Sequence, residues 1–63
     1  MAWLAVDKNG SCNIYNCQPR RTHTQWVIPK EHYSDGTYIT ISRDTATKIA
    51  GFKIQFGNEA IEI

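Results

Sequence analysis

Two cysteines and two histidines are the side chains best suited to chemistry in this 63-residue sequence. Cys12, Cys17, His23 and His32 are separated by four, five and eight intervening residues. Structural zinc sites prefer cysteine pairs on a turn and histidine pairs about three to five residues apart, so the histidine spacing argues against zinc. A Cys12–Cys17 disulfide is disfavoured too, because five strand positions span roughly 16 Å whereas bridged Cα atoms lie within about 7 Å. We predict that both thiols stay free, with Cys12 in the core, and that the chain holds no metal or cofactor.

Recognisable catalytic arrangements are missing from the sequence. It contains no Ser/His/Asp order, carboxylate pair or glycine-rich phosphate loop at a convincing site. His23 lies close to two arginines and could act as a general base or contact phosphate, but a lone histidine on a polar loop is usually solvated. A chain of this length is also expected to lack room for the pocket of about 300 Å³ that a ligand usually needs. We therefore predict no catalytic residue and no enzymatic activity.

The segment 19–26 has the composition of a binding surface. Arg20 and Arg21 could form bidentate contacts to phosphate or carboxylate, and an exposed Trp26 could stack on a base or anchor a protein interface. The other interpretation, a solvated loop followed by a core tryptophan, is the simpler one. The candidate partner-binding residues are Tyr15, Arg20, Arg21, His23, Trp26 and Lys30.

Short strands must position these side chains. The alternation of residues 3–6 predicts a strand, because successive side chains point to opposite faces of a sheet. Residues 7–10, Asp-Lys-Asn-Gly, suit a hairpin loop, with aspartate starting a type I turn and glycine where positive φ is needed. The return strand over 11–16 then places Cys12 and Tyr15 on opposite faces.

Further strands and one helix are predicted along the rest of the chain. The pattern predicts an exposed loop over 18–24, a third strand over 25–28, a turn over 30–36 and a fourth strand over 37–42. A short helix near 44–50 follows, with Ser42 or Asp44 as its N-cap. Gly51 stands where a helix ends in the left-handed conformation.

The last residues alternate in the manner of strands. Residues 53–56 and 59–63 either pair across Gly57-Asn58 or run on as two extended segments. Together the elements predict a single α+β domain over 1–63. It consists mostly of an antiparallel sheet of about four to six short strands, with an N-terminal hairpin and one short helix near the C-terminal part.

Composition indicates an ordinary globular domain, 41% hydrophobic and 21% charged with a formal net charge of +1. A nucleic-acid binder usually has a denser basic face than this. No apolar run approaches the ~20 residues of a membrane span, and the first residues lack the basic flank and apolar core of a signal peptide. We expect a cytoplasmic protein that does not enter the membrane. Two Trp, three Tyr and two Phe are too many to bury in so small a domain, so we expect an exposed apolar patch that meets a partner or forms a homodimer.

A pattern of short motifs runs through the chain. It opens with Met1-Ala2-Trp3-Leu4-Ala5-Val6-Asp7-Lys8-Asn9-Gly10 and continues with Ile14-Tyr15, Pro19-Arg20-Arg21, Trp26 and Ile49-Ala50-Gly51. This pattern resembles a set of very small proteins carried by bacteriophages, prophages and other mobile elements. In the last ten residues, Phe56, Asn58 and Ala60 stand where that set tends to have Trp, Asp and Pro. The resemblance implies a phage-type accessory protein, and it carries over no catalytic or ligand residue.

Two hypotheses for function follow. The first is a non-catalytic phage-type accessory protein in the host cytoplasm that binds a host or phage protein, including as an inhibitor of a host-defence component. The alternative is a small nucleic-acid-binding β domain, in which Arg20, Arg21, Lys30 and Trp26 contact a strand. Salt separates the two, because affinity for nucleic acid falls steeply as salt is added.

Overall fold

An antiparallel hairpin lies at the centre of the fold in the computed structural model, which describes residues 1–63. β1 (Trp3–Val6) pairs with β2 (Cys12–Tyr15) so that Trp3 faces Tyr15 and Val6 faces Cys12. In the connecting turn the Gly10 N–H donates to the Asp7 carbonyl at 2.9 Å, and Gly10 has a φ of 93° that favours glycine. The predicted hairpin is confirmed.

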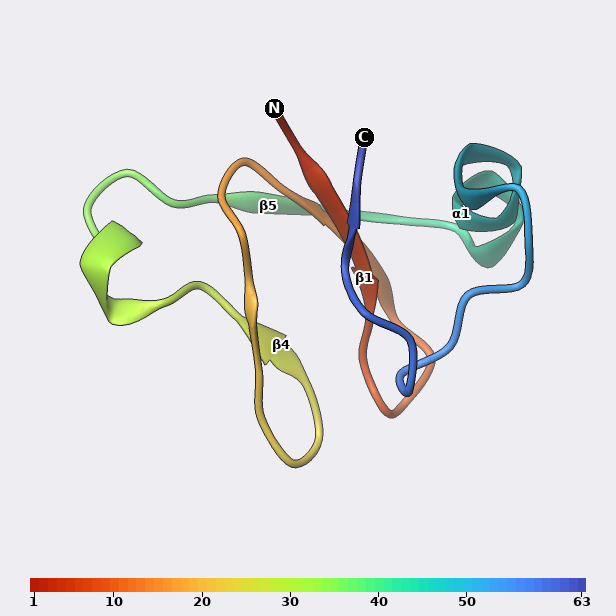
Figure 1. The fold of residues 1–63 in the computed structure, drawn as a ribbon, viewed down its shortest axis with the longest axis horizontal. Coiled ribbons are helices and arrows are strands. Elements are labelled where there is room, and N and C mark those ends of the chain that lie inside the picture. Colours follow the sequence, from red (N-terminus) through yellow and green to blue (C-terminus); the bar gives the residue numbers. More distant parts are fainter.

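Each hairpin strand has a second antiparallel neighbour. The strand order is β5-β2-β1-β6, with β5 (Tyr38–Ile41) on β2 and β6 (Ile61–Glu62) on β1. The predicted fourth strand is therefore confirmed. Backbone hydrogen bonds between Ala2 and Ile63 hold the two chain ends side by side at one end of β1 (Figure 1).

A separate two-stranded sheet forms where part of an exposed loop was expected. β3 (Arg20–Arg21) pairs with β4 (Trp26–Val27), and we call this unit the ribbon. The prediction of a loop over 18–24 is wrong at the two arginines. The cause is the turn between the strands, where the Thr22 N–H donates to the Gln25 carbonyl at 2.7 Å and the Thr22 hydroxyl donates to the same oxygen at 2.9 Å. The third strand is confirmed at β4, but it lies outside the main sheet.

The helix α1 (Arg43–Ala50) begins and ends where the capping residues predict. The Ser42 Oγ accepts a hydrogen bond from the Thr45 N–H at 3.1 Å. Gly51 adopts the left-handed conformation with a φ of 82°, and its N–H donates to the Thr47 carbonyl at 2.8 Å. The helix is eight residues long, and no helix of the structure has the length and apolar character needed to cross a membrane.

The C-terminal segment does not form the hairpin that was one of two expectations. A tight turn forms instead, in which the Asn58 N–H donates to the Gln55 carbonyl at 3.0 Å and the Asn58 Oδ1 accepts from the Gln55 N–H at 2.9 Å. The chain then continues to β1, where β6 completes the sheet edge. Residues 53–56 form no strand, and the chain turns at Gln55 instead.

The four-stranded sheet is covered on both sides, so the fold has three layers. Figure 1 shows α1 and the ribbon on opposite sides of β1. We call the two surfaces of the sheet the helix face and the ribbon face. The core of the helix face consists of Leu4, Val6, Cys12, Ala46 and Ile54. The core of the ribbon face consists of Ala5, Tyr15 and Trp26. The element between ribbon and β5 is η1 (Lys30–His32), a short 3-10 turn inside the predicted turn 30–36.

Candidate partner-binding surface

The ribbon is attached to the main sheet through the backbone of Trp26. Because Thr22 and Gln25 bond to each other across the ribbon, strand alternation directs the backbone groups of Trp26 away from β3. Its N–H donates to the Asp7 Oδ1 at 2.8 Å, and its carbonyl accepts from the Tyr15 hydroxyl at 3.2 Å. Two side chains of the N-terminal hairpin thus form hydrogen bonds with the backbone N–H and C=O of Trp26 on the outer edge of β4.

Asp7 and Asn13 extend this attachment into a polar network on the ribbon face. The Asn13 side chain is 4% exposed, and its Nδ2 lies 3.5 Å from the Asp7 Oδ2. The Asn13 Oδ1 accepts from the Thr40 hydroxyl at 2.8 Å. The network therefore runs from β5 through the hairpin to the ribbon and links the two sheets.

Tyr15 is held as a neutral hydrogen-bond donor. Burial, together with the negative charge of Asp7, raises the pKa of Tyr15 from 10.0 to about 12. The phenol therefore keeps its proton at neutral pH and is unsuited to act there as a base.

A hollow of about 370 Å³, partly open to solvent, lies between the two sheets. Its apolar lining consists of Tyr15, Trp26, Val27, Ile28, Tyr33 and Tyr38. Its polar lining consists of Asp7, Asn13 and Gln25. The expectation that so short a chain has no room for a hollow of this size is wrong, because the ribbon stands off from the sheet on the polar network. We call this feature the aromatic hollow.

Two tyrosines at the aromatic hollow are open to solvent. Tyr33 is 73% exposed and Tyr38 is 53% exposed. The Tyr38 ring lies over that of Tyr15, with 5.4 Å between ring centroids and an interplanar angle of 35°. Tyr38 therefore supplies exposed apolar contact area whose position is set by packing against the buried Tyr15 ring.

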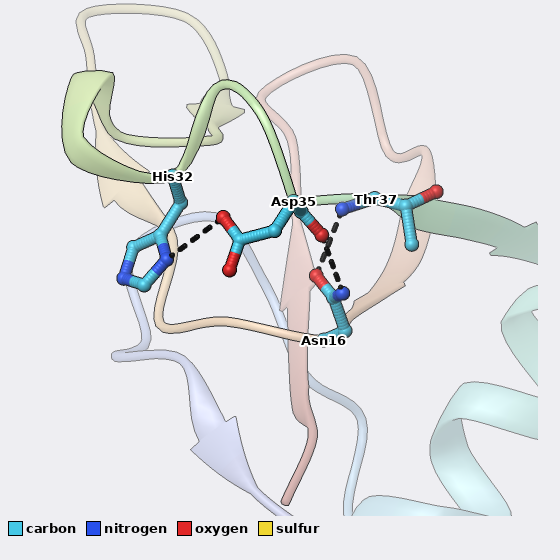
Figure 2. Close-up of polar contacts among 4 residues, drawn as sticks. All are labelled: Asn16, His32, Asp35 and Thr37. Carbon is cyan, nitrogen blue, oxygen red and sulfur yellow. Dashed lines mark hydrogen bonds and ion pairs between the residues drawn. The ribbon is translucent and has the colours of Figure 1, made fainter.

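The loop that carries Tyr33 is fixed by Asn16 (Figure 2). The Asn16 Nδ2 donates to the Asp35 carbonyl at 2.9 Å, and its Oδ1 accepts from the Thr37 N–H at 2.8 Å. The His32 Nδ1 lies 3.4 Å from the Asp35 Oδ1. Gly36 packs so closely that an added Cβ would lie 2.5 Å from the Ile28 Cγ2. This loop is therefore a defined part of the surface.

Arg20 and Arg21 do not form the joint basic surface that the sequence suggested. Neighbouring residues of a strand project to opposite faces, and Arg21 lies opposite Trp26 whereas Arg20 lies opposite Val27. The Arg21 guanidinium is 4.7 Å from the centre of the Trp26 ring and donates to the Asn58 carbonyl at 2.7 Å. Arg20 pairs with Glu31 at 3.2 Å, with both side chains exposed. Arg21 thus ties the C-terminal segment to the ribbon.

The remaining candidates divide by burial. Trp26 is 6% exposed and Tyr15 is 2% exposed, so Trp26 is a core residue, as the simpler interpretation of the sequence has it, and the alternative of an exposed ring available for stacking is wrong. Both rings are buried because they pack together with Ala5 in the core of the ribbon face. His23 and Lys30 are exposed, on the ribbon turn and at the start of η1. The structure therefore does not bring the six candidates together.

Both cysteines are free and buried, and Cys12 packs in the core of the helix face as predicted. Burial raises the pKa of Cys17, and the nearby charges of Asp35 and Glu31 act in the same direction. That thiol is therefore poorly suited to nucleophilic chemistry. No group of three or more His, Cys, Asp or Glu side chains is placed to hold a metal ion.

Asp7, Asn13, Tyr33 and Tyr38 line the aromatic hollow and are not among the candidate residues predicted from the sequence. The sequence placed Asp7 in the hairpin turn. In the structure its side chain also accepts a hydrogen bond from the backbone N–H of Trp26. The signal for Asn13 was present, since a polar amide on an otherwise apolar strand face needs a partner when buried.

Comparison with protein-family models, with curated proteins and with solved structures found no match.

Proposed function

We propose that this chain is a non-catalytic accessory protein that binds another protein through the aromatic hollow. The observation that carries the proposal is the exposure of Tyr33 and Tyr38, at 73% and 53%, beside a hollow that the buried rings of Tyr15 and Trp26 also line. Exposed aromatic side chains held over a fixed scaffold are typical anchors of protein interfaces, because they supply contact area at little entropic cost.

The charge distribution favours a protein partner over nucleic acid. No Lys or Arg lines the aromatic hollow, and the carboxylate of Asp7 does. A phosphate placed there would meet a negative charge. Arg20 is paired with Glu31, and Arg21 is held by Asn58 and Trp26. The electrostatic attraction that dominates nucleic-acid binding is therefore weak on this face.

Three features support a binding role over a catalytic one. Tyr15 keeps its proton because of its raised pKa. The two oxygens of Asp7 face the Trp26 N–H and the Asn13 amide. No His, Cys, Ser or Lys side chain lines the aromatic hollow, so apart from the engaged Asp7 carboxylate it lacks the usual nucleophiles and bases.

The resemblance to phage and prophage accessory proteins suggests where to seek the partner. We propose a protein of the host cell or of the phage, acting in the host cytoplasm. Components of host defence, which such a protein would inhibit by binding, are the first partners to test.

Affinity capture from host lysate tests the proposal. Wild-type protein is compared with Tyr33→Ala and with Phe52→Ala, a matched aromatic truncation at a residue that follows α1 and is 48% exposed. The Tyr33 side chain makes no hydrogen bond within the chain, so its removal should leave the fold intact. A partner should be recovered by wild type and by Phe52→Ala, and its affinity for Tyr33→Ala should fall by at least about tenfold.

Two results would contradict the proposal. Recovery of no protein by any variant removes the binding role. Equal recovery by wild type and Tyr33→Ala means that the partner binds elsewhere. A gel shift at low salt addresses the nucleic-acid alternative, and binding that weakens steeply as salt is added would favour it.

A further inference from the structure

The aromatic hollow contains one unbalanced charge, the carboxylate of Asp7. The other polar residues of its lining, Asn13 and Gln25, are neutral amides. The two ion pairs of the structure lie elsewhere, and neither includes Asp7. No cation of this chain therefore lies within ion-pair distance of the one carboxylate that lines the hollow.

One oxygen of Asp7 retains most of its capacity to accept hydrogen bonds. Oδ1 accepts from the Trp26 N–H at 2.8 Å, whereas the contact between Oδ2 and the Asn13 Nδ2 is 3.5 Å long. Hydrogen bonds of this type are usually about 2.7–3.2 Å long, and each carboxylate oxygen can accept about two of them. Oδ2 is therefore a weakly bonded acceptor on a side chain that is partly exposed.

The charge of Asp7 acts on groups inside the hollow. After burial, it is the second cause that raises the pKa of Tyr15, because a nearby negative charge disfavours the tyrosinate anion. The field that disfavours an anion at this position favours a cation there. Electrostatic complementarity therefore selects a positively charged occupant.

Aromatic rings supply the second element of a cation site. The negative face of a ring attracts a cation that lies within about 6 Å of its centre. Within this chain, the Arg21 guanidinium forms such contacts with Trp26 and Phe56. The exposed rings of Tyr33 and Tyr38 have no cation of the chain over them, so both remain available to one from outside.

We propose that the aromatic hollow receives an arginine side chain of the partner protein, an inference that rests on the proposed function. The guanidinium donates to the Asp7 carboxylate and stacks on the exposed tyrosines, while its carbon stem packs on the apolar lining. Arginine suits the hollow better than lysine, because a guanidinium is more weakly hydrated and stacks on aromatic faces. The hollow is partly open to solvent, so the bound charge keeps part of its hydration.

A titration with two capped tripeptides tests the proposal on the full chain without the partner. One peptide is acetyl-Gly-Arg-Gly-amide, and in the other citrulline replaces arginine, which keeps nearly the same shape and removes the charge. Amide NMR spectra of the isotope-labelled protein follow binding at constant ionic strength. We expect the arginine peptide to bind with a Kd on the order of 1 mM and to shift residues that line the hollow. The citrulline peptide should bind about fivefold to tenfold more weakly.

Asp7→Asn isolates the contribution of the charge, because asparagine keeps an oxygen that can accept from the Trp26 N–H. The variant should bind the arginine peptide only as weakly as the citrulline peptide, whose affinity should not change. A distorted hollow would instead weaken both peptides alike. Asp44→Asn is the matched control, since Asp44 is exposed on α1, across β1 from the ribbon (Figure 1). It should bind both peptides like wild type.

Tyr33→Ala tests the aromatic contribution and leaves the hydrogen bonds of Asp7 in place. It should weaken binding of the arginine peptide by a few-fold. Circular dichroism checks that each variant is folded.

Three results would overturn the proposed arginine site. These are equal affinities of wild type for the two peptides, no spectral shift with the arginine peptide at about 20 mM, and an arginine preference that Asp7→Asn leaves unchanged.

Affinity capture with Asp7→Asn separates this inference from the proposed function. A partner that is lost with Tyr33→Ala but bound equally by Asp7→Asn leaves the proposed function standing and overturns the arginine site. Capture of no protein by any variant removes the proposed function, and the arginine of a partner falls with it.

Discussion

The helix face and the ribbon face of the same sheet are built in different ways. On the helix face, Leu4 and Val6 pack with Ala46 of α1 and with Ile54, and the core cluster is entirely apolar. On the ribbon face, the core of Ala5, Tyr15 and Trp26 is accompanied by a polar network and by the aromatic hollow. The strands are shared, since alternate residues supply the two faces.

The difference comes from what covers each face. A helix satisfies its own backbone hydrogen bonds, so α1 can lie on apolar side chains alone. The ribbon has strands of two residues, and the outer backbone groups of Trp26 need partners from the sheet. Asp7 and Tyr15 supply them at 2.8 and 3.2 Å. We infer that the core of the helix face contributes most of the free energy of unfolding. On the ribbon face, the polar network and the aromatic hollow leave room for a partner.

Leu4→Ala should have the largest effect on stability. Leu4 is fully buried in the helix face, and such truncations cost about 2–5 kcal/mol because a cavity remains. A domain of this size has a free energy of unfolding of roughly 3–5 kcal/mol, so a large fraction of the variant should be unfolded. Urea unfolding followed by circular dichroism measures the change.

Ile49→Ala provides the comparison for Leu4→Ala. Ile49 is 41% exposed on α1, and alanine is the better helix former, so the loss should stay below about 1 kcal/mol. Similar losses for both variants would mean that the helix face is not the main source of stability.

Tyr15 should make stability depend on pH in the alkaline range. Its pKa is about 12 in the folded chain against 10.0 for the free side chain, so between these values the unfolded chain binds fewer protons. The contribution is fully present below pH 10 and is lost as pH rises from about 10 to 12. Its size is on the order of 3 kcal/mol.

Urea unfolding at several pH values, for wild type and Tyr15→Phe, measures this contribution. Tyr15→Phe loses the hydrogen bond to the Trp26 carbonyl, worth about 1 kcal/mol at neutral pH, and should show a shallower alkaline decline. Parallel declines in the two proteins would refute the role assigned to Tyr15.

The parts of the fold that the sequence predicted are those with local signals. The N-terminal hairpin has strict alternation and a glycine at its turn, and α1 has Ser42 and Gly51 at its ends. The ribbon lacked such a signal, because two arginines resemble a solvated loop and their pairing depends on the turn between Thr22 and Gln25.

Long-range pairing explains the other differences. The C-terminal residues could alternate equally well in a local hairpin or beside β1, and only the fold decides between the two. The same limit applies to the candidate surface. Trp26 was a reasonable anchor by type, but its burial depends on Asp7, nineteen positions away in the chain. Tyr33 and Tyr38 come together with Trp26 only because the ribbon folds back over β2 and β5.

The smallest expected change in stability comes from a comparison of two neighbouring arginines on the ribbon. Arg21→Ala removes the hydrogen bond to the Asn58 carbonyl and the contact with the Trp26 ring, and should cost about 1 kcal/mol. Arg20→Ala removes only an exposed ion pair with Glu31, and should change stability by less than about 0.5 kcal/mol. Urea unfolding of both variants in the same buffer measures the difference. Equal effects would mean that Arg21 does not tie the C-terminal segment to the ribbon, and that the ribbon face is held by Asp7 and Tyr15 alone.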